Sequence, residues 1–212
     1  MTDPLSFRIK KKIDRYIHDP IVALIILPFF LILKILPFKI SSLICGSLVY
    51  LIAPFTKYQK RVLNNLNIAF PQKKEAEKIK ISKRFWFNFG QIIGELPHID
   101  KIISSKKILI SGHKKIQKGP AILIGAHLAN WEFLLRVGEM SGRRVSFVYR
   151  PINNWILNKL QFSRNSKINA DFFKKGRAAA IGMANKLKKG EVIGLTNDQI
   201  LREGIMVPFF GK

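Results

Sequence analysis

The chain contains little cysteine and little acidic charge. Its 212 residues include one cysteine, Cys45, which excludes an internal disulfide framework and suits a protein kept in a reducing compartment. Only 13 residues are acidic, against 37 lysines and arginines, so the formal net charge is +24. This surplus predicts an acidic partner, but charge alone leaves open nucleic acid, an anionic membrane surface, and an acidic substrate or carrier protein.

Motifs of several function classes are also missing. The sequence has no zinc-finger spacing, RNP block or glycine-rich phosphate loop, which argues against a nucleic-acid-binding protein. It has no G-x-S-x-G elbow, so we expect no serine nucleophile of the α/β-hydrolase type. His113, the histidine nearest to His127, lies outside any metal-ligand spacing with it, so we expect no metal and disfavour a metal hydrolase.

A long apolar run occupies the amino-terminal part. Within residues 20–55 the only formal charges are Lys34 and Lys39, a composition typical of a membrane segment. Because Pro28, Pro37 and the two lysines divide the run, we expect one kinked span or a partly interfacial helix rather than two spans. A secretory signal peptide is the alternative, but the run is too long and no small-residue cleavage pattern follows it.

The rest of the chain shows two helical patterns and then an α/β pattern. Residues 60–71 and 73–97 carry apolar residues at helical spacing; the stripe from Phe85 to Leu96 is interpreted as core-facing, with a lipid-contacting aromatic face as the alternative. Further along, strands are predicted at 107–112, 121–126, 145–149 and 191–196, and helices at 129–140 and 176–188.

This alternation predicts an α/β fold: a mixed, mostly parallel sheet flanked by helices, preceded by a membrane-anchoring helical segment. We expect the basic amino terminus and the anchor over residues 1–56 and the α/β domain over residues 57–212. In such sheets, ligand sites lie at the carboxyl ends of the strands.

One histidine lies at such a strand end. His127 follows the apolar run 121–126, and Glu132 comes five residues later. On one continuous helix, residues five apart point about 140° apart, but a strand-to-helix turn lets the carboxylate reach back to the imidazole. A carboxylate that fixes the tautomer makes histidine a better general base, here for a substrate hydroxyl. On spacing alone, a polar pair that caps a helix is the alternative.

The residues around this pair carry a family resemblance. HLANWE, residues 127–132, resembles the H-x4-D/E block of the glycerolipid acyltransferase superfamily. Within that superfamily, the asparagine and tryptophan of the block resemble those of the lipid A branch, the late lauroyl or myristoyl transferases. The blocks RVLNNLNIAFP and GELPHI before HLANWE, and VYRPINN, the KKG segment, LTNDQ and VPFFGK after it, occur in the family's order. Family members usually continue well past VPFFG, so we expect a carboxyl-terminal part to be missing and an apolar sheet face to be exposed.

The resemblance implies a reaction and its partners. Family members transfer a fatty acyl chain from acyl carrier protein to a hydroxyacyl chain of a phosphorylated lipid A precursor, at the cytoplasmic face of the bacterial inner membrane. The carrier-protein thioester is the donor, so no cofactor is expected. Carrier protein, glycolipid acceptor and anionic membrane are all acidic, which suits the positive charge. The alternatives are an inactive membrane-bound scaffold and an acyltransferase with another glycolipid or phospholipid acceptor.

The resemblance also implies site residues. They are the general base and its partner, two basic substrate-binding positions, and a further substrate-binding block: His127, Glu132, Arg150, Arg164, Asp198 and Gln199. Guanidinium groups pair well with phosphates or a developing oxyanion. For each arginine a solvated surface position is the alternative, and for Asp198 an ordinary turn.

Overall fold

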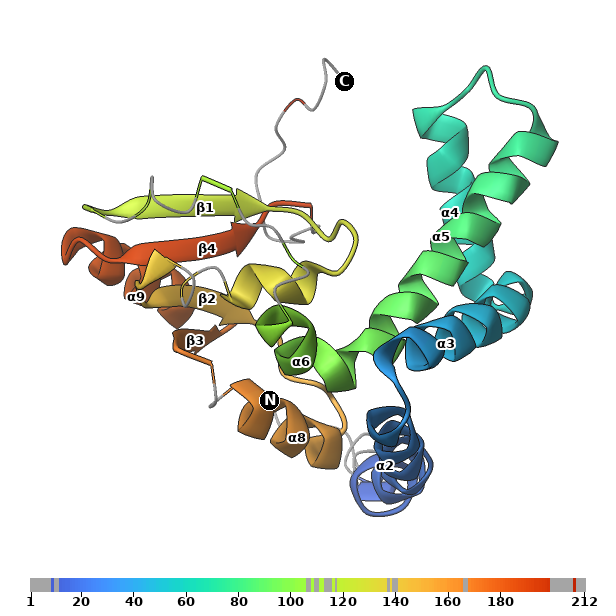
Figure 1. The fold of residues 1–212 in the computed structure, drawn as a ribbon, viewed down its shortest axis with the longest axis horizontal. Helices are drawn as coiled ribbons and strands as arrows, with labels where there is room; N and C mark the ends of the chain where they lie inside the picture. Colours follow the sequence, from blue (N-terminus) through green and yellow to red (C-terminus); the bar gives the residue numbers. More distant parts are fainter. Residues whose placement is uncertain are drawn as a thin grey trace. The chain divides into compact units, whose positions relative to one another are not determined.

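The computed structural model describes residues 9, 12–105, 108, 111–112, 116, 118–136, 138, 141–165, 168–198 and 208. These residues form a mixed α/β protein with a four-stranded parallel sheet flanked by helices and an apolar helix near the amino terminus (Figure 1), which confirms the predicted fold class. The chain folds as two compact units, one from the described residues of 1–111 and 151–167 and one from those of 112–150 and 168–212. The predicted division between residues 56 and 57 stays a prediction.

The first unit is helical. Its elements are a π-helical turn Asp14–His18, α2 Asp19–Ile35, α3 Phe38–Ile52, a 3-10 turn Ala53–Phe55, α4 Lys57–Ala69, α5 Glu75–Glu95, a 3-10 turn Leu96–His98, α6 Ile99–Ser104 and α8 Trp155–Asn165. The two helical patterns of the sequence are thus confirmed as α4 and α5.

Two helices of this unit are long and apolar enough to cross a membrane, by length and composition alone: Asp14–Ile35 and Phe38–Phe55. The first has 22 residues and reaches about 33 Å at about 1.5 Å per residue, close to the thickness of a hydrocarbon core. The expectation that Pro28 divides the run is wrong, because Pro28 lies inside α2 and removes only one backbone donor. Pro37 does separate α2 from α3.

A buried histidine satisfies a carbonyl at this break. Within α2, the carbonyl of Leu33 would accept from the residue four positions later, but that residue is Pro37, which has no N–H. The Nε2 atom of His98 lies 2.8 Å from the Leu33 oxygen, and His98 is 2% exposed. A carbonyl can only accept, so Nε2 of His98 carries a hydrogen. His98 caps the end of α2 from inside the unit.

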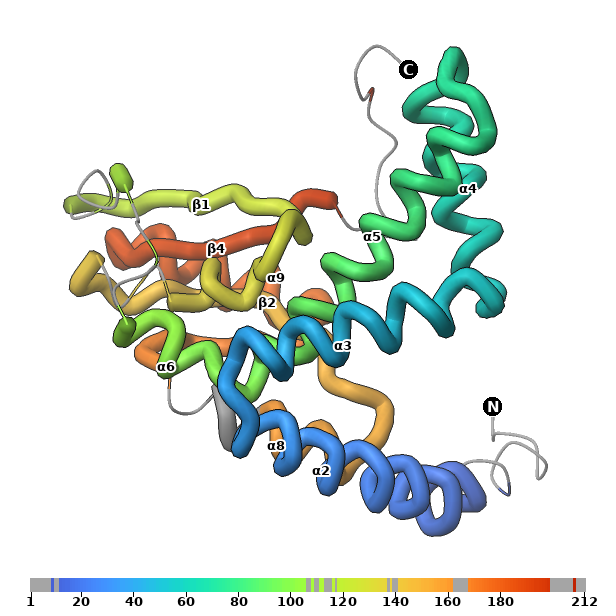
Figure 2. Tube along the Cα trace, turned by 45° about the vertical axis from the view of Figure 1, so that its right-hand side comes forward, coloured from blue at the N-terminus to red at the C-terminus, as the bar shows by residue number. Residues whose placement is uncertain are grey.

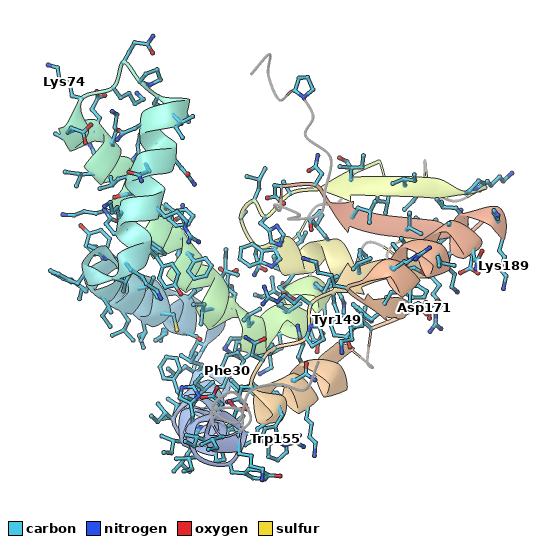
Figure 3. All side chains as sticks on the ribbon, turned by 180° about the vertical axis from the view of Figure 1, so that it is seen from behind. Phe30, Lys74, Tyr149, Trp155, Asp171 and Lys189 are labelled. Atoms are coloured by element: carbon cyan, nitrogen blue, oxygen red, sulfur yellow. The ribbon has the colours of Figure 1, made fainter. Side chains whose placement is uncertain are left out.

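A second set of bonds ties α8 to the beginning of α2, and Figure 2 shows the two helices side by side. The Oδ1 atom of Asn154 accepts two backbone N–H groups of the first turn of α8, and its Nδ2 donates to the Asp19 carbonyl at 2.8 Å. The backbone N–H of Trp155, a residue labelled in Figure 3, donates to the Asp19 carboxylate at 3.2 Å, and its indole N–H donates to the Arg15 carbonyl at 3.1 Å. The apolar amino-terminal helix is therefore also a structural support for α8.

Small residues bring α3 and α5 into close contact. A Cβ atom at Gly90 would overlap the Cys45 carbonyl, and one at Gly94 would overlap the Ser41 carbonyl. The Ser41 hydroxyl donates to the Gly94 carbonyl at 2.6 Å. Helices inside membranes commonly pack in this way, through small residues four positions apart and hydrogen bonds from serine hydroxyls.

This packing decides which face of α5 is buried. Trp86 is buried and its indole donates to the Gln59 side chain of α4 at 2.6 Å, whereas Phe85 and Phe89 are 45% and 36% exposed. The prediction of a core-facing stripe is therefore wrong for the two phenylalanines and holds for Ile92, which is buried. The close approach at the glycines turns a neighbouring face of α5 toward α3.

The second unit is built on a parallel sheet with the strand order β1-β4-β2-β3. Its elements are β1 Ala121–Gly125, a 3-10 turn Trp131–Arg136, β2 Val145–Tyr149, β3 Ala170–Lys174, α9 Arg177–Lys188 and β4 Val192–Thr196. Three predicted strands and the predicted helix at 176–188 are confirmed. The predicted strand at 107–112 lies largely outside the described residues, the described start of 129–140 forms the 3-10 turn, and β3 was not predicted.

The two faces of this sheet are covered unequally. Val145, Phe147 and Val192 form the centre of a buried apolar cluster on one face. On β1, Ile122 and Ile124 remain 53% and 67% exposed. The edge strand β1 thus exposes two apolar side chains, and the expectation of a missing carboxyl-terminal part stays a prediction.

Candidate active site

His127 and Asp198 occupy equivalent positions on neighbouring strands. The parallel pairing of β1 with β4 runs from Ala121 opposite Val192 to Gly125 opposite Thr196. It is extended by a bond from the Asn197 N–H to the Gly125 carbonyl at 3.1 Å. Two residues beyond the last paired position, the same register brings His127 opposite Asp198, 71 residues later in the chain.

The Asp198 carboxylate holds His127 at two points. Oδ2 accepts the backbone N–H of His127 at 2.6 Å, and Oδ1 lies 2.8 Å from the ring atom Nδ1. Hydrogen bonding from the His127 side chain, helped by its backbone N–H, lowers the pKa of Asp198 below the usual aspartate value. An ionised carboxylate only accepts, so Nδ1 carries a hydrogen and the lone pair of the neutral imidazole lies on Nε2.

The pair lies at an accessible and strained turn. The side chains of His127 and Asp198 are 30% and 36% exposed. The Trp131 ring packs edge-on against the imidazole, with ring centroids 5.2 Å apart. In the loop between His127 and Trp131, Ala129 has a φ of 47°, in the left-handed region that non-glycine residues seldom adopt. Strained backbone of this kind clusters at functional sites.

Glu132 lies in the 3-10 turn directly after this loop. Its backbone N–H donates to the Oδ1 atom of Asn130 at 3.3 Å. The described contacts pair Nδ1 of His127 with Asp198, and the expected partnership between Glu132 and His127 stays a prediction. Sequence reasoning placed Asp198 near substrate but did not join it to His127, because only the strand register brings the two together.

The remaining predicted residues are distributed over both units. Arg150 follows β2 at the carboxyl edge of the sheet, is exposed, and forms no ion pair in the described part of the chain. Arg164 belongs to α8 of the first unit, and its side chain is outside the described part. Gln199 lies outside the described residues. The substrate-binding roles of these residues and of Asp198 stay predictions.

The fold and the site together describe an α/β enzyme scaffold with a carboxylate-oriented histidine, on a chain that also carries helices of membrane-spanning length. The family of bacterial lipid A biosynthesis acyltransferases matches residues 8–212. The chain belongs to this family, which confirms the resemblance and supports an acyltransferase. A comparison with curated proteins finds no significant match.

Among the described residues, no group of three or more histidine, cysteine, aspartate and glutamate side chains could hold a metal ion.

Proposed function

We propose that the protein transfers a fatty acyl chain from acyl carrier protein to a hydroxyacyl chain of a phosphorylated lipid A precursor, with His127 as the general base. The observation that carries this proposal is the bond between Nδ1 of His127 and Asp198, at the carboxyl edge of the sheet in a member of the lipid A acyltransferase family. No serine elbow is present, so the acceptor hydroxyl itself is the nucleophile.

The proposed reaction is a direct acyl transfer. Nε2 of His127 takes the proton from the acceptor hydroxyl while its oxygen attacks the thioester carbonyl. A C–O bond forms, the C–S bond breaks, and the carrier-protein thiolate leaves and takes up the proton from the imidazolium. The Asp198 carboxylate stabilises that imidazolium and keeps the hydrogen on Nδ1. Glu132 supplies a second negative charge in the same block, and the arginines bind anionic groups of the substrates.

We place this reaction at the cytoplasmic face of the inner membrane. Several apolar side chains of α2, α3 and the following turn are largely exposed, among them Leu24 at 74%, Ile35 at 85% and Phe55 at 90%. A lipid bilayer would remove these surfaces from water. Basic residues on both sides of the apolar segment suit anionic headgroups, and the net charge of +24 suits an acidic carrier protein.

An acyl-transfer assay with His127→Ala tests this function. The substrates are acyl carrier proteins loaded with chains of several lengths and a phosphorylated disaccharide lipid with hydroxyacyl chains, in detergent micelles. The matched control is His18→Ala, because His18 is an exposed histidine in the π-helical turn of the first unit. We expect wild type and His18→Ala to form acylated product, and His127→Ala to lose about 10²–10⁴-fold in kcat.

Two outcomes would contradict the proposal in different ways. Undiminished transfer by His127→Ala would remove histidine as the base. Absence of transfer by the wild-type chain from every donor would favour the inactive scaffold. Transfer to a phospholipid or to a glycolipid without the hydroxyacyl chains would keep the chemistry and change the acceptor.

A further inference from the structure

At the amino edge of the parallel sheet, two cations are paired with carboxylates, whereas Lys188 and Lys189, exposed at the same end of α9, form no ion pair among the described residues. At the amino edge, Arg144 and Lys186 bind the Asp171 carboxylate at 2.7 and 2.8 Å, and Lys186 also binds Glu191 at 2.7 Å. Burial alone would raise the pKa of Asp171, but hydrogen bonds donated by Lys186 and Arg144 hold it below the usual value. The carboxylates of Asp171 and Glu191, which accept from Lys186, raise the pKa of Lys186. The charges of these four groups balance locally.

The carboxyl edge has positive charges without this balance. Arg150 follows β2, Lys174 ends β3, Lys175 comes next, and Arg177 begins α9. All four side chains are exposed, and in the described part of the chain none of them forms an ion pair. Figure 3 shows Tyr149, the residue before Arg150, toward this edge and Asp171 toward the other. Unbalanced cations at the ligand-binding edge of a parallel sheet are available to an anionic substrate.

The strand register places these cations at the same edge of the sheet as the catalytic pair, with Arg150 and Lys175 one residue before the level of His127 and Asp198. Tyr149 faces Lys174, and the Lys175 N–H donates to the Tyr149 carbonyl at 2.9 Å, so Arg150 and Lys175 lie level with each other. The pairing of β2 with β4, continued from Phe147 opposite Gly194, brings Arg150 opposite Asn197. In sheet order, the edge therefore carries His127, Asp198, Arg150 and Lys175.

The spacing of the strands gives this row a length. Neighbouring strands lie about 4.8 Å apart. The backbone of β2 is two strands away from β1, about 10 Å, and that of β3 is three strands away, about 14 Å. Gly176, with φ of 147°, allows β3 to turn directly into α9, whose first turn contains no acidic residue.

We propose that Arg150, Lys174 and Lys175 form a subsite for a phosphate group of the acceptor lipid. The proposal rests on the proposed function, because it takes the hydroxyl at Nε2 of His127 as the other end of the same substrate. A phosphate monoester pairs strongly with guanidinium and ammonium groups. The backbones that carry the subsite cations thus lie about 10–14 Å from the backbone that carries His127.

An acidic carrier protein would also be attracted to these cations. A stable protein interface needs about 800 Å² on each partner, whereas these cations form one narrow row at the ends of two neighbouring strands, β2 and β3. A row of that size fits a lipid headgroup. Docking of the carrier protein at this edge is therefore treated as the competing outcome of the test.

The test compares two double variants with the same loss of charge. Lys174→Gln with Lys175→Gln removes two of the three subsite cations, and Lys188→Gln with Lys189→Gln is the control, because both of these lysines are exposed at the other end of α9. Initial rates give kcat and the KM of each substrate, with the phosphorylated acceptor and with the same lipid after enzymatic removal of its phosphates. Binding to vesicles of phosphatidylethanolamine and phosphatidylglycerol measures membrane attachment separately.

We expect the subsite variant to raise the KM of the phosphorylated acceptor about tenfold or more, from the loss of two charged contacts. Its kcat, carrier-protein KM and vesicle binding should match those of the control. With the dephosphorylated acceptor the difference between variant and control should disappear. An unchanged acceptor KM would overturn the proposal. A raised KM for the carrier protein would instead assign the edge to the donor. Vesicle binding weakened as much as acceptor binding would assign the edge to the membrane surface.

Two further measurements separate this proposal from the proposed function. If the wild-type chain shows no transfer, equilibrium binding of the phosphorylated and dephosphorylated acceptors in micelles tests the subsite without catalysis. A preference for the phosphorylated lipid that is lost in the subsite variant supports it, and equal binding of both lipids contradicts it. If the double variant fails to fold, Arg150→Gln is tested by the same measurements, and the same results support or contradict the proposal.

Discussion

Replacing Asp198 by asparagine changes one charge and keeps the shape of the side chain. In the wild-type protein, both carboxylate oxygens accept, one from the backbone N–H of His127 and one from Nδ1–H. The amide of Asp198→Asn has one oxygen only. If this oxygen stays on the backbone N–H, the amide NH₂ faces Nδ1, which must then act as acceptor. The ring hydrogen consequently moves to Nε2 and blocks proton abstraction from the acceptor hydroxyl.

The expected loss follows from this change of tautomer. General-base catalysis contributes about 10²–10⁴-fold, and the corresponding aspartate-to-asparagine change in a serine protease triad costs about 10⁴-fold. The variant also lacks the charge that stabilises the imidazolium. We therefore expect kcat to fall about 10³–10⁴-fold, equivalent to about 4–5.5 kcal/mol of transition-state stabilisation.

Initial rates of acyl transfer measure this effect, with product separated from acceptor by thin-layer chromatography. The matched control is Asp171→Asn, the same substitution in a second aspartate with a lowered pKa, at the amino edge of the sheet. Assays are run below the melting temperature of both variants, and the control should keep the wild-type kcat. A kcat of Asp198→Asn within about tenfold of wild type would refute the role given to this carboxylate.

Three further predictions concern the packing of α3 against α5, the hydrogen bonds between α8 and α2, and the pKa of Asp171. Gly94→Leu should separate α3 from α5 and lower the free energy of unfolding in detergent by about 2 kcal/mol or more, measured by thermal melting; an unchanged melting temperature would contradict the close packing. Asn154→Asp should keep the cap of α8 but lose the donor to the α2 helix, so proteolysis of α8 should become faster than in the neighbouring control Asn153→Asp. Because the folded pKa of Asp171 is lowered, its contribution to stability is present above the unfolded value of about 3.9 and is lost as the pH falls through the folded value; Asp171→Asn should flatten this part of the stability curve.

Local patterns in the sequence were sufficient for much of the sheet. Short apolar runs ending in turn residues predicted β1, β2 and β4, and helical spacing predicted α9. The strand β3, ADFFK, was missed because Asp171 and Lys174 interrupt its apolar character, and its pairing with β2 is a tertiary feature.

The candidate site was predictable only in part for the same reason. The exit of a strand identified His127, but its hydrogen bond to Asp198 depends on the strand order, which places β4 beside β1 despite the long separation in sequence. On α5, hydrophobicity pointed to the aromatic residues as the buried face. The structure buries the side that carries Gly90 and Gly94 instead, because small residues allow the backbones to approach.

The imidazole tautomers show directly whether Asp198 holds His127 with its lone pair on Nε2. Protein labelled with ¹⁵N-histidine is measured by NMR in detergent micelles at a pH where the imidazoles are neutral, and the His127 signals are assigned from their absence in His127→Ala. We expect hydrogen on Nδ1 for His127 and on Nε2 for His98, which donates to the Leu33 carbonyl and serves as an internal reference. Hydrogen on Nε2 of His127 in the wild-type protein would show that Asp198 does not fix this tautomer.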